Sequence, residues 1–167
     1  VIDEEGWFRT GDIGEITDEG FLRITDRKKD LIVTAGGKNI APQPIENRLK
    51  KNPFVDQAVM IGDRRRFPVL LVVPAFERLE AWAWQQGIDV SGRRELIERS
   101  ETQELLAAQV FGELEGLARF ERPKKLGLVA EEFTIENGLL TPTQKVKRRV
   151  VETRFAELIE RFYREES

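Results

Sequence analysis

VDQAVMIGDRRRFPVLLVV, residues 55–73, contains two apolar runs on either side of a charged turn. Val55–Ile61 and Val69–Val73 have the length of ordinary strands and are rich in branched apolar side chains. Runs of this kind predict strands, and Gly62–Arg66 between them predicts the turn that joins them. We expect these two strands to form the centre of a small sheet.

Helical patterns surround the two strands. Pro42 and Pro44 suit the first turn of a helix that runs to about Lys51, and Ile45 and Leu49 lie four residues apart on its inner face. This helix is therefore expected to pack on the sheet through one apolar side.

Beyond the strands, helices are predicted at Phe76–Gln86, which Gly87 closes, and at about Thr102–Arg119. Pro123 precedes a third strand near Leu126–Val129. The last predicted helix is amphipathic, and its apolar side chains are Val146, Val150, Phe155, Leu158, Ile159 and Phe162.

The residues before these elements predict shorter ones. Gly14–Ile16 and Phe21–Ile24 alternate apolar and polar residues around Thr17–Gly20, which is typical of a β-hairpin. A strand at Leu31–Val33 follows, and Thr34–Asn39 predicts a tight loop because it contains two glycines. The whole order predicts an α+β fold with a short β-hairpin, a central sheet of about three strands and flanking helices.

The composition is that of a globular protein with a restricted chemistry. The chain has 167 residues, of which 40% are apolar and 34% charged, and no cysteine or histidine. Disulfides, thiol nucleophiles, histidine bases and ordinary zinc sites are therefore excluded from it. The net charge of −3 gives no general attraction to nucleic acids or anionic membranes. Because the only methionine is Met60, we expect the chain to be part of a longer polypeptide.

Two motifs are ambiguous when each is taken alone. Gly36, Gly37 and Lys38 resemble part of a phosphate-binding loop, but Asn39 stands where such a loop has Ser or Thr, so a glycine turn is the simpler interpretation. Lys145–Arg149 is a basic run that fits a solvated helix start better than a nucleic-acid site, since no aromatic residues alternate with it.

Four motifs in a fixed order are more specific together. They are GWFRTGD (6–12), DRKKDLI (26–32), GGKNI with PIE (36–40 and 44–46), and LTPTQKVK (140–147). The set resembles the adenylate-forming superfamily of acyl-CoA synthetases, peptide-synthetase adenylation domains and luciferases. The LTPTQKVK ending, the FTIENG run before it (133–138) and the helical insertion at about 76–122 look like the long-chain fatty-acyl-CoA synthetases.

The resemblance implies how the chain is divided. Residues 1–25 would be the end of a large N-terminal adenylation domain, 26–30 a hinge, and 31–167 a mobile C-terminal domain. The large domain, the expected partner, would hold the fatty acid, ATP and most of the Mg²⁺ ligands, and no metal ligand is assigned to this chain. The complete enzyme would form an acyl-adenylate and then a thioester with CoA, whereas the isolated chain would be inactive.

The resemblance also implies a nucleotide site and a hinge residue. Asp12 would accept hydrogen bonds from the ribose hydroxyls of ATP, and Arg27 would contact the same region. Lys29 matches the position about which the small domain turns.

The remaining implied roles belong to the two half-reactions. Gly36, Gly37 and Lys38 would line the CoA channel after the small domain has rotated. Lys145 matches the lysine of the first half-reaction, in which a carboxylate attacks the α-phosphate of ATP. One positioned charge of this kind contributes about 3–4 kcal/mol to a transition state.

Other interpretations share part of this evidence. A fatty-acyl-AMP ligase or a peptide-synthetase adenylation domain carries the same motifs, and a non-catalytic protein-binding module with this fold stays open. We expect a cytoplasmic protein without a nucleic-acid partner, and peripheral membrane contact of the complete protein stays open.

Overall fold

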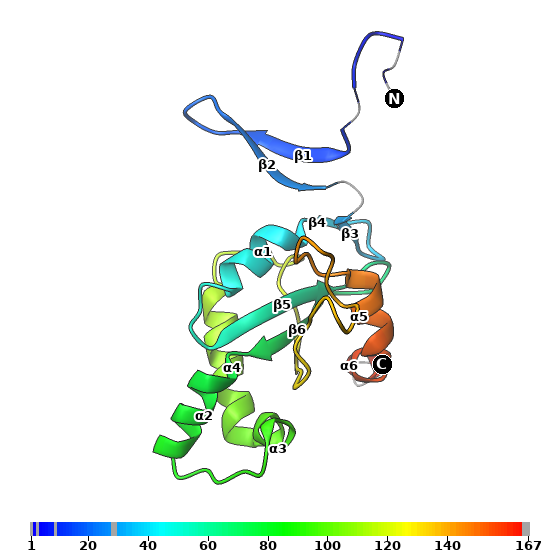
Figure 1. Cartoon of the computed structure of the whole chain (residues 1–167). Coiled ribbons are helices and arrows are strands. Elements are labelled where there is room, and N and C mark those ends of the chain that lie inside the picture. Colours follow the sequence, from blue (N-terminus) through cyan, green and yellow to red (C-terminus); the bar gives the residue numbers. More distant parts are fainter. Residues whose placement is uncertain (1, 3, 9, 28–29, 165–167) are drawn as a thin grey trace.

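The computed structural model describes residues 2, 4–8, 10–27 and 30–164, and within them the expected α+β fold is confirmed (Figure 1). Figure 1 shows the β1–β2 hairpin at one end of the molecule, next to α1, and the helices α2 and α3 at the other. The strands are β1 Asp12–Ile16, β2 Leu22–Arg27, β3 Ile32–Val33, β4 Asn39–Ile40, β5 Val55–Ile61, β6 Val69–Pro74 and β7 Lys125–Leu128. The helices are α1 Pro42–Leu49, α2 Phe76–Gln85, α3 Arg93–Glu98, α4 Ser100–Glu113, α5 Arg148–Arg154 and α6 Ala156–Arg164.

The central sheet has three strands in the order β5-β6-β7. β5 and β6 are antiparallel, with Ile61 opposite Val69, and β7 is parallel to β6. The predicted bounds of β5 are confirmed at both ends, and β6 runs one residue beyond the predicted Val73. The β3–β4 pair and the β1–β2 hairpin are separate two-stranded sheets.

Both faces of the central sheet are buried, because successive side chains of a strand point to opposite faces. Residues 58, 60, 70 and 72 pack with α1, the β3–β4 pair and the end of α4. Residues 59, 61, 69, 71 and 73 pack with α2, α3, α5 and α6. The continuous apolar run of β6 and the apolar residues 58–61 of β5 thus reflect burial on two sides.

Three helix predictions need correction. α4 ends at Glu113, and not near Arg119, because the chain turns there and reaches Gly116 with a left-handed φ of 89°. Leu114 and Leu117 still pack inward, so the helical spacing of apolar residues in the sequence continues past the end of the helix. α3 was not predicted, because six residues are too few to show a helical period. The terminal helix is divided into α5 and α6 at Phe155, whose φ and ψ of −109° and 24° leave the helical range.

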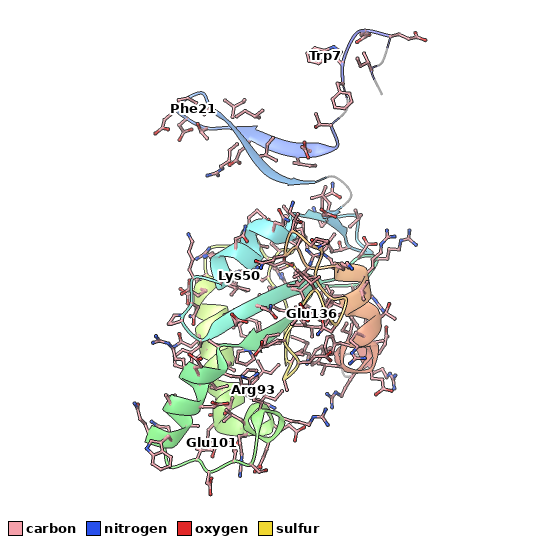
Figure 2. All side chains as sticks on the ribbon, viewed as in Figure 1. Trp7, Phe21, Lys50, Arg93, Glu101 and Glu136 are labelled. Carbon is pink, nitrogen blue, oxygen red and sulfur yellow. The ribbon has the colours of Figure 1, made fainter. Side chains whose placement is uncertain are left out.

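The N-terminal hairpin exposes its apolar side chains. It turns at Thr17–Gly20 as predicted, where the Gly20 N–H donates to the Thr17 carbonyl at 2.8 Å. Figure 2 shows Trp7 and Phe21 on this part of the chain, away from the central sheet. The apolar side chains that are more than half exposed here are Ile2, Trp7, Phe8, Ile16, Phe21, Leu22 and Ile24. An apolar surface of this extent is typical of an interaction surface.

Gly127 allows α6 to pack closely on β7. A Cβ atom at this position would lie 2.8 Å from Leu71 Cδ2 and 3.1 Å from two ring carbons of Phe162. Leu71 is fully buried, so a new methyl group would displace core side chains. We predict that Gly127→Ala lowers the free energy of unfolding by about 1–3 kcal/mol, the usual cost of overpacking.

Gly112→Ala in α4 is the matched control. No atom lies within 4 Å of a Cβ placed there, so the substitution is expected to raise the free energy of unfolding by about 0.5–1 kcal/mol through helix propensity. Urea unfolding measures both variants. A Gly127→Ala protein as stable as the unaltered chain would contradict the close contact between α6 and β7.

Candidate functional site

Lys145 lies on a tight loop whose ends, residues 140 and 146, pair as an isolated antiparallel bridge. Within the loop the Gln144 N–H donates to the Thr141 carbonyl at 2.8 Å, and Gln144 adopts a left-handed φ of 59°. The Thr141 hydroxyl accepts the Lys145 N–H at 3.0 Å. Pro142 restricts the backbone between them. These contacts hold the lysine backbone in one conformation while its side chain stays exposed.

A buried ion pair anchors this loop to the domain. Arg148, the first residue of α5, pairs with Glu46 of α1, with 2.5 Å between Arg148 Nη1 and Glu46 Oε1. Glu46 also accepts the N–H of Met60 at 2.7 Å, and Arg148 donates to the Met60 carbonyl. The two side chains are only 8% and 20% exposed. β5 is an edge strand, so the Met60 N–H and C=O, which point away from β6, have no partner within the sheet. The ion pair supplies a hydrogen-bond partner for each of them.

An open cleft of about 710 Å³ lies beside the loop. Its lining runs from Asp30 and Leu31, past α1, to residues 144–150. Lys145 and four other basic side chains face it together with four carboxylates, so the cleft carries a mixed charge; Lys50, one of the basic ones, is labelled in Figure 2. The cleft brings Asp30, the last residue of the predicted hinge, and Leu31 beside the lysine loop.

The glycine loop connects β3 to β4 and is fixed by Thr34. The Thr34 N–H donates to the Lys38 carbonyl at 3.0 Å, and the Thr34 hydroxyl accepts the Lys38 N–H at 3.1 Å. Gly37 has a left-handed φ of 74°, which accounts for glycine at this position. Gly36, Gly37 and Lys38 are exposed, and the Lys38 ammonium lies 5.7 Å from the Phe120 ring centre. None of the described residues lining the cleft comes from this loop, so the structure holds the glycines apart from it.

The predicted nucleotide-binding residues face each other across the hairpin. Asp12 of β1 is the Cα partner of Arg27 of β2, which places both at the open end of the β1–β2 ladder. The Asp12 N–H donates to the Thr10 hydroxyl at 3.0 Å. The side chain of Arg27 and the whole of Lys29 lie outside what the structure describes, so the hinge assignment of Lys29 stays a prediction.

Sequence reasoning missed the residues that support the loops. The sequence assigns no role to Glu46 within its motif, predicts a solvated surface for the basic run that contains Arg148, and predicts only the start of a loop at Thr34. The signal for Glu46 was its place one residue after Ile45 on the inner side of α1, where a charge needs a partner.

Comparison with known proteins places this arrangement in a family. The sequence profile of the AMP-binding enzyme C-terminal domain matches residues 29–113, just over half of the chain. The chain belongs to this family of C-terminal domains. This match confirms the prediction, made from the four motifs, that the chain is related to the adenylate-forming enzymes.

The relatives of this AMP-binding enzyme C-terminal domain include complete ligases. It is 39% identical over 166 residues to the long-chain-fatty-acid–CoA ligase FadD15 of Mycobacterium tuberculosis, covering 97% of this chain and 27% of that protein. It is 41% identical over 168 residues to the peroxisomal long chain acyl-CoA synthetase 6 of Arabidopsis thaliana, covering 99% and 24%. The chain thus spans about a quarter of the length of these relatives.

Solved structures agree with this domain in fold. The adenylation domain of a carboxylate reductase from Mycobacterium chelonae superposes with a TM-score of 0.71 at 28% identity, covering 98% of this chain and 24% of that one. The fold prediction and the family assignment therefore rest on independent observations.

We predict that removal of Arg148 destabilises this domain strongly. Arg148→Met leaves the Glu46 carboxylate buried without its cation, and such a break typically costs about 3–5 kcal/mol. Urea unfolding measures the loss. Arg154→Met is the matched control, because Arg154 pairs with Glu131 at a more exposed position and is expected to cost at most about 1 kcal/mol. Equal effects of the two substitutions would contradict the anchoring role of Arg148.

Tyr163 provides a pH-dependent reporter for α6. Its hydroxyl donates to the Phe67 carbonyl at 3.0 Å, and burial raises the pKa of Tyr163 to about 12, despite the opposing effect of the nearby Arg65. An unfolded tyrosine has a pKa of about 10. Because the folded pKa is the higher one, this group stabilises the fold fully below about pH 10 and loses that contribution as the pH rises through about 12.

Tyr163 is the only tyrosine, so its phenolate absorbance can be read directly. We expect a spectrophotometric midpoint near 12 in the folded chain and a return to about 10 in concentrated urea. A folded-state midpoint near 10 would mean that the hydroxyl is not buried against Phe67.

Proposed function

We propose that this chain is the C-terminal domain of an ATP-dependent long-chain fatty-acid–CoA ligase and supplies the lysine for acyl-adenylate formation. The observation that carries the proposal is Lys145, exposed on a rigid loop that the buried Glu46–Arg148 pair ties to α1 and β5. The long-chain ligases among its relatives support the substrate class.

In the first half-reaction a fatty-acid carboxylate oxygen attacks the α-phosphorus of ATP, an acyl–phosphate bond forms, and pyrophosphate leaves. The attack brings two anions together, and negative charge builds up on the α-phosphate oxygens. The Lys145 ammonium neutralises part of this charge without transferring a proton. A point charge on a flexible side chain can enter a site that closes around it, while the rigid loop sets its approach.

In the second half-reaction the CoA sulfur attacks the acyl carbon and AMP leaves. We assign the change between the two steps to rotation of residues 31–167 about the segment 26–30, with Lys29 at the hinge. Rotation withdraws Lys145 and presents the glycine loop. Gly36 and Gly37 add no side chain to the channel wall, so the narrow pantetheine arm of CoA can pass along their backbone.

The hairpin is assigned to the interface with the N-terminal part of the ligase. The exposed apolar side chains of the hairpin and of the residues before it, among them Phe21 and Trp7, would be buried there. Asp12 and Arg27 would then face the ribose of the bound nucleotide from the edge of that domain.

The remaining substrate contacts are assigned to the N-terminal part as well. No cluster of three or more metal-ligating side chains occurs in the described residues. We assign the protein ligands of the Mg²⁺ bound with ATP to the N-terminal part. No described helix is both long and apolar enough to cross a membrane. The chain on its own is proposed not to catalyse adenylation.

The carboxylate reductase neighbours favour a second candidate function. Their adenylation domains share this fold, and one solved neighbour is an adenylation–carrier-protein didomain. An acceptor thiol on a carrier protein would then replace CoA. Thioester formation with free CoA by the complete protein distinguishes the two candidates.

The proposal predicts that Lys145→Ala slows adenylation by about 10²–10³-fold, the effect of removing one preorganised charge. Pyrophosphate release from ATP and palmitate by the complete ligase measures this step. Transfer of the acyl group from supplied palmitoyl-adenylate to CoA should be retained, because that step takes place with Lys145 withdrawn.

Lys51→Ala is the matched control, since Lys51 is an exposed lysine outside the cleft. It should leave both half-reactions unchanged. Equal loss of both half-reactions in Lys145→Ala would contradict the assigned role. An absence of palmitate-dependent pyrophosphate release in the unaltered ligase would contradict the substrate class.

A further inference from the structure

The loop between β5 and β6, residues 62–68, supports the glycine loop through hydrogen bonds. The Arg65 carbonyl accepts the Ala35 N–H at 2.8 Å, and the Arg64 N–H donates to the Val33 carbonyl at 2.8 Å. Asp63 Oδ1 accepts the Val33 N–H at 3.1 Å. Val33 at the end of β3 and Ala35 in the glycine loop are therefore both bonded to this one neighbouring loop.

The same β5–β6 loop is held on its other side by α6. Arg65 forms a two-point ion pair with Glu160, and its guanidinium lies 4.9 Å from the centre of the Tyr163 ring. Tyr163 donates to the Phe67 carbonyl at 3.0 Å, and Arg66 donates to the Tyr163 carbonyl at 3.0 Å. Arg65 thus contacts α6 with its side chain and the glycine loop with its carbonyl.

The β5–β6 loop has little freedom of its own. A Cβ atom on Gly62 would lie 2.9 Å from Pro68 Cα and 3.3 Å from Ile32 Cγ2, so the loop begins in close contact with β3. Arg64 is held at a left-handed φ of 58°, which an arginine rarely adopts without constraint. The loop is thus constrained at Gly62 and at Arg64, so a change at its anchor on α6 reaches the residues to which it bonds.

We infer that Arg65, Glu160 and Tyr163 form a positioning cluster through which α6 sets the conformation of the glycine loop for the CoA-dependent step. This inference rests on the proposed function, in which the glycine loop lines the CoA channel. An ordered loop binds CoA without first losing backbone entropy, whereas a released loop loses that entropy on binding. The bonds of the cluster lead through the β5–β6 loop to Val33 and Ala35, and the proposed function assigns the glycine loop to the second half-reaction.

Hydrogen exchange of the chain tests the coupling without reference to function. In Arg65→Met the amides of Val33 and Ala35 should exchange about tenfold faster, as expected for the loss of a charge-assisted contact of ordinary strength. The Met60 and Lys145 amides should keep their exchange rates. Arg154→Met, which breaks a comparable surface pair with Glu131, should leave all four unchanged.

Kinetics of the complete ligase test the consequence. In Arg65→Met the KM for CoA should rise about tenfold, matching the exchange effect, while the KM for ATP is unaltered. The double variant Arg65→Glu/Glu160→Arg, in which the two charges change places, should restore the KM for CoA. The ion pair forms again in this variant, and the backbone carbonyl of residue 65 is retained. A general loss of stability would alter the KM for ATP as well, so the difference between the two KM values identifies the positioning role.

The outcomes separate the inference from the proposed function. Unchanged exchange at Val33 and Ala35 in Arg65→Met overturns the coupling, whatever the enzyme does. Faster exchange with an unaltered KM for CoA overturns the positioning role and removes the glycine loop from the CoA channel. Palmitate-dependent adenylation by the same preparations reports separately on the proposed ligase activity.

Discussion

The buried ion pair between Glu46 and Arg148 is the contact on which the rest of the site depends. It joins three segments that are far apart in sequence, since Glu46 precedes Arg148 by 102 residues and both bond to Met60 of β5. A buried carboxylate without a cation is costly, so the pair forms only when α1, β5 and α5 are assembled. The lysine loop, which ends two residues before Arg148, is thereby fixed to the finished core.

Both functional loops are held by the same end of β5. Met60 receives the ion pair that anchors the lysine loop. Residues 63–65, just beyond Ile61, bond to Val33 at the end of β3 and to Ala35 in the glycine loop. The core fixes this strand end, because the residues of β5 and β6 pack with helices on both faces. The lysine loop and the glycine loop are therefore rigidly related to each other, which suits a domain that presents them in turn by moving as one body.

The sequence predicts the sheet and the motif-bearing loops better than the helix ends and the supporting contacts. Val55–Ile61 is read correctly because burial on both faces makes residues 58–61 continuously apolar, and Val55 marks the start of the strand. The end of α4 is misread because Leu114 and Leu117 continue the apolar spacing after the helix has ended. Glu46 and Arg148 cannot be paired from sequence, since any of the many charges could be partners until the fold brings two of them together.

The most direct test of this account is a double-mutant cycle on adenylation in the complete ligase. Pyrophosphate release with ATP and palmitate is measured for the unaltered protein, Arg148→Met, Lys145→Ala and the double variant, at a temperature where all four are folded. Arg148 is proposed to affect adenylation only by positioning Lys145. Its substitution should therefore slow adenylation when Lys145 is present and have no further effect when Lys145 is absent. If Arg148→Met slowed the Lys145→Ala enzyme by the same factor as the unaltered one, the ion pair would not be what positions the lysine.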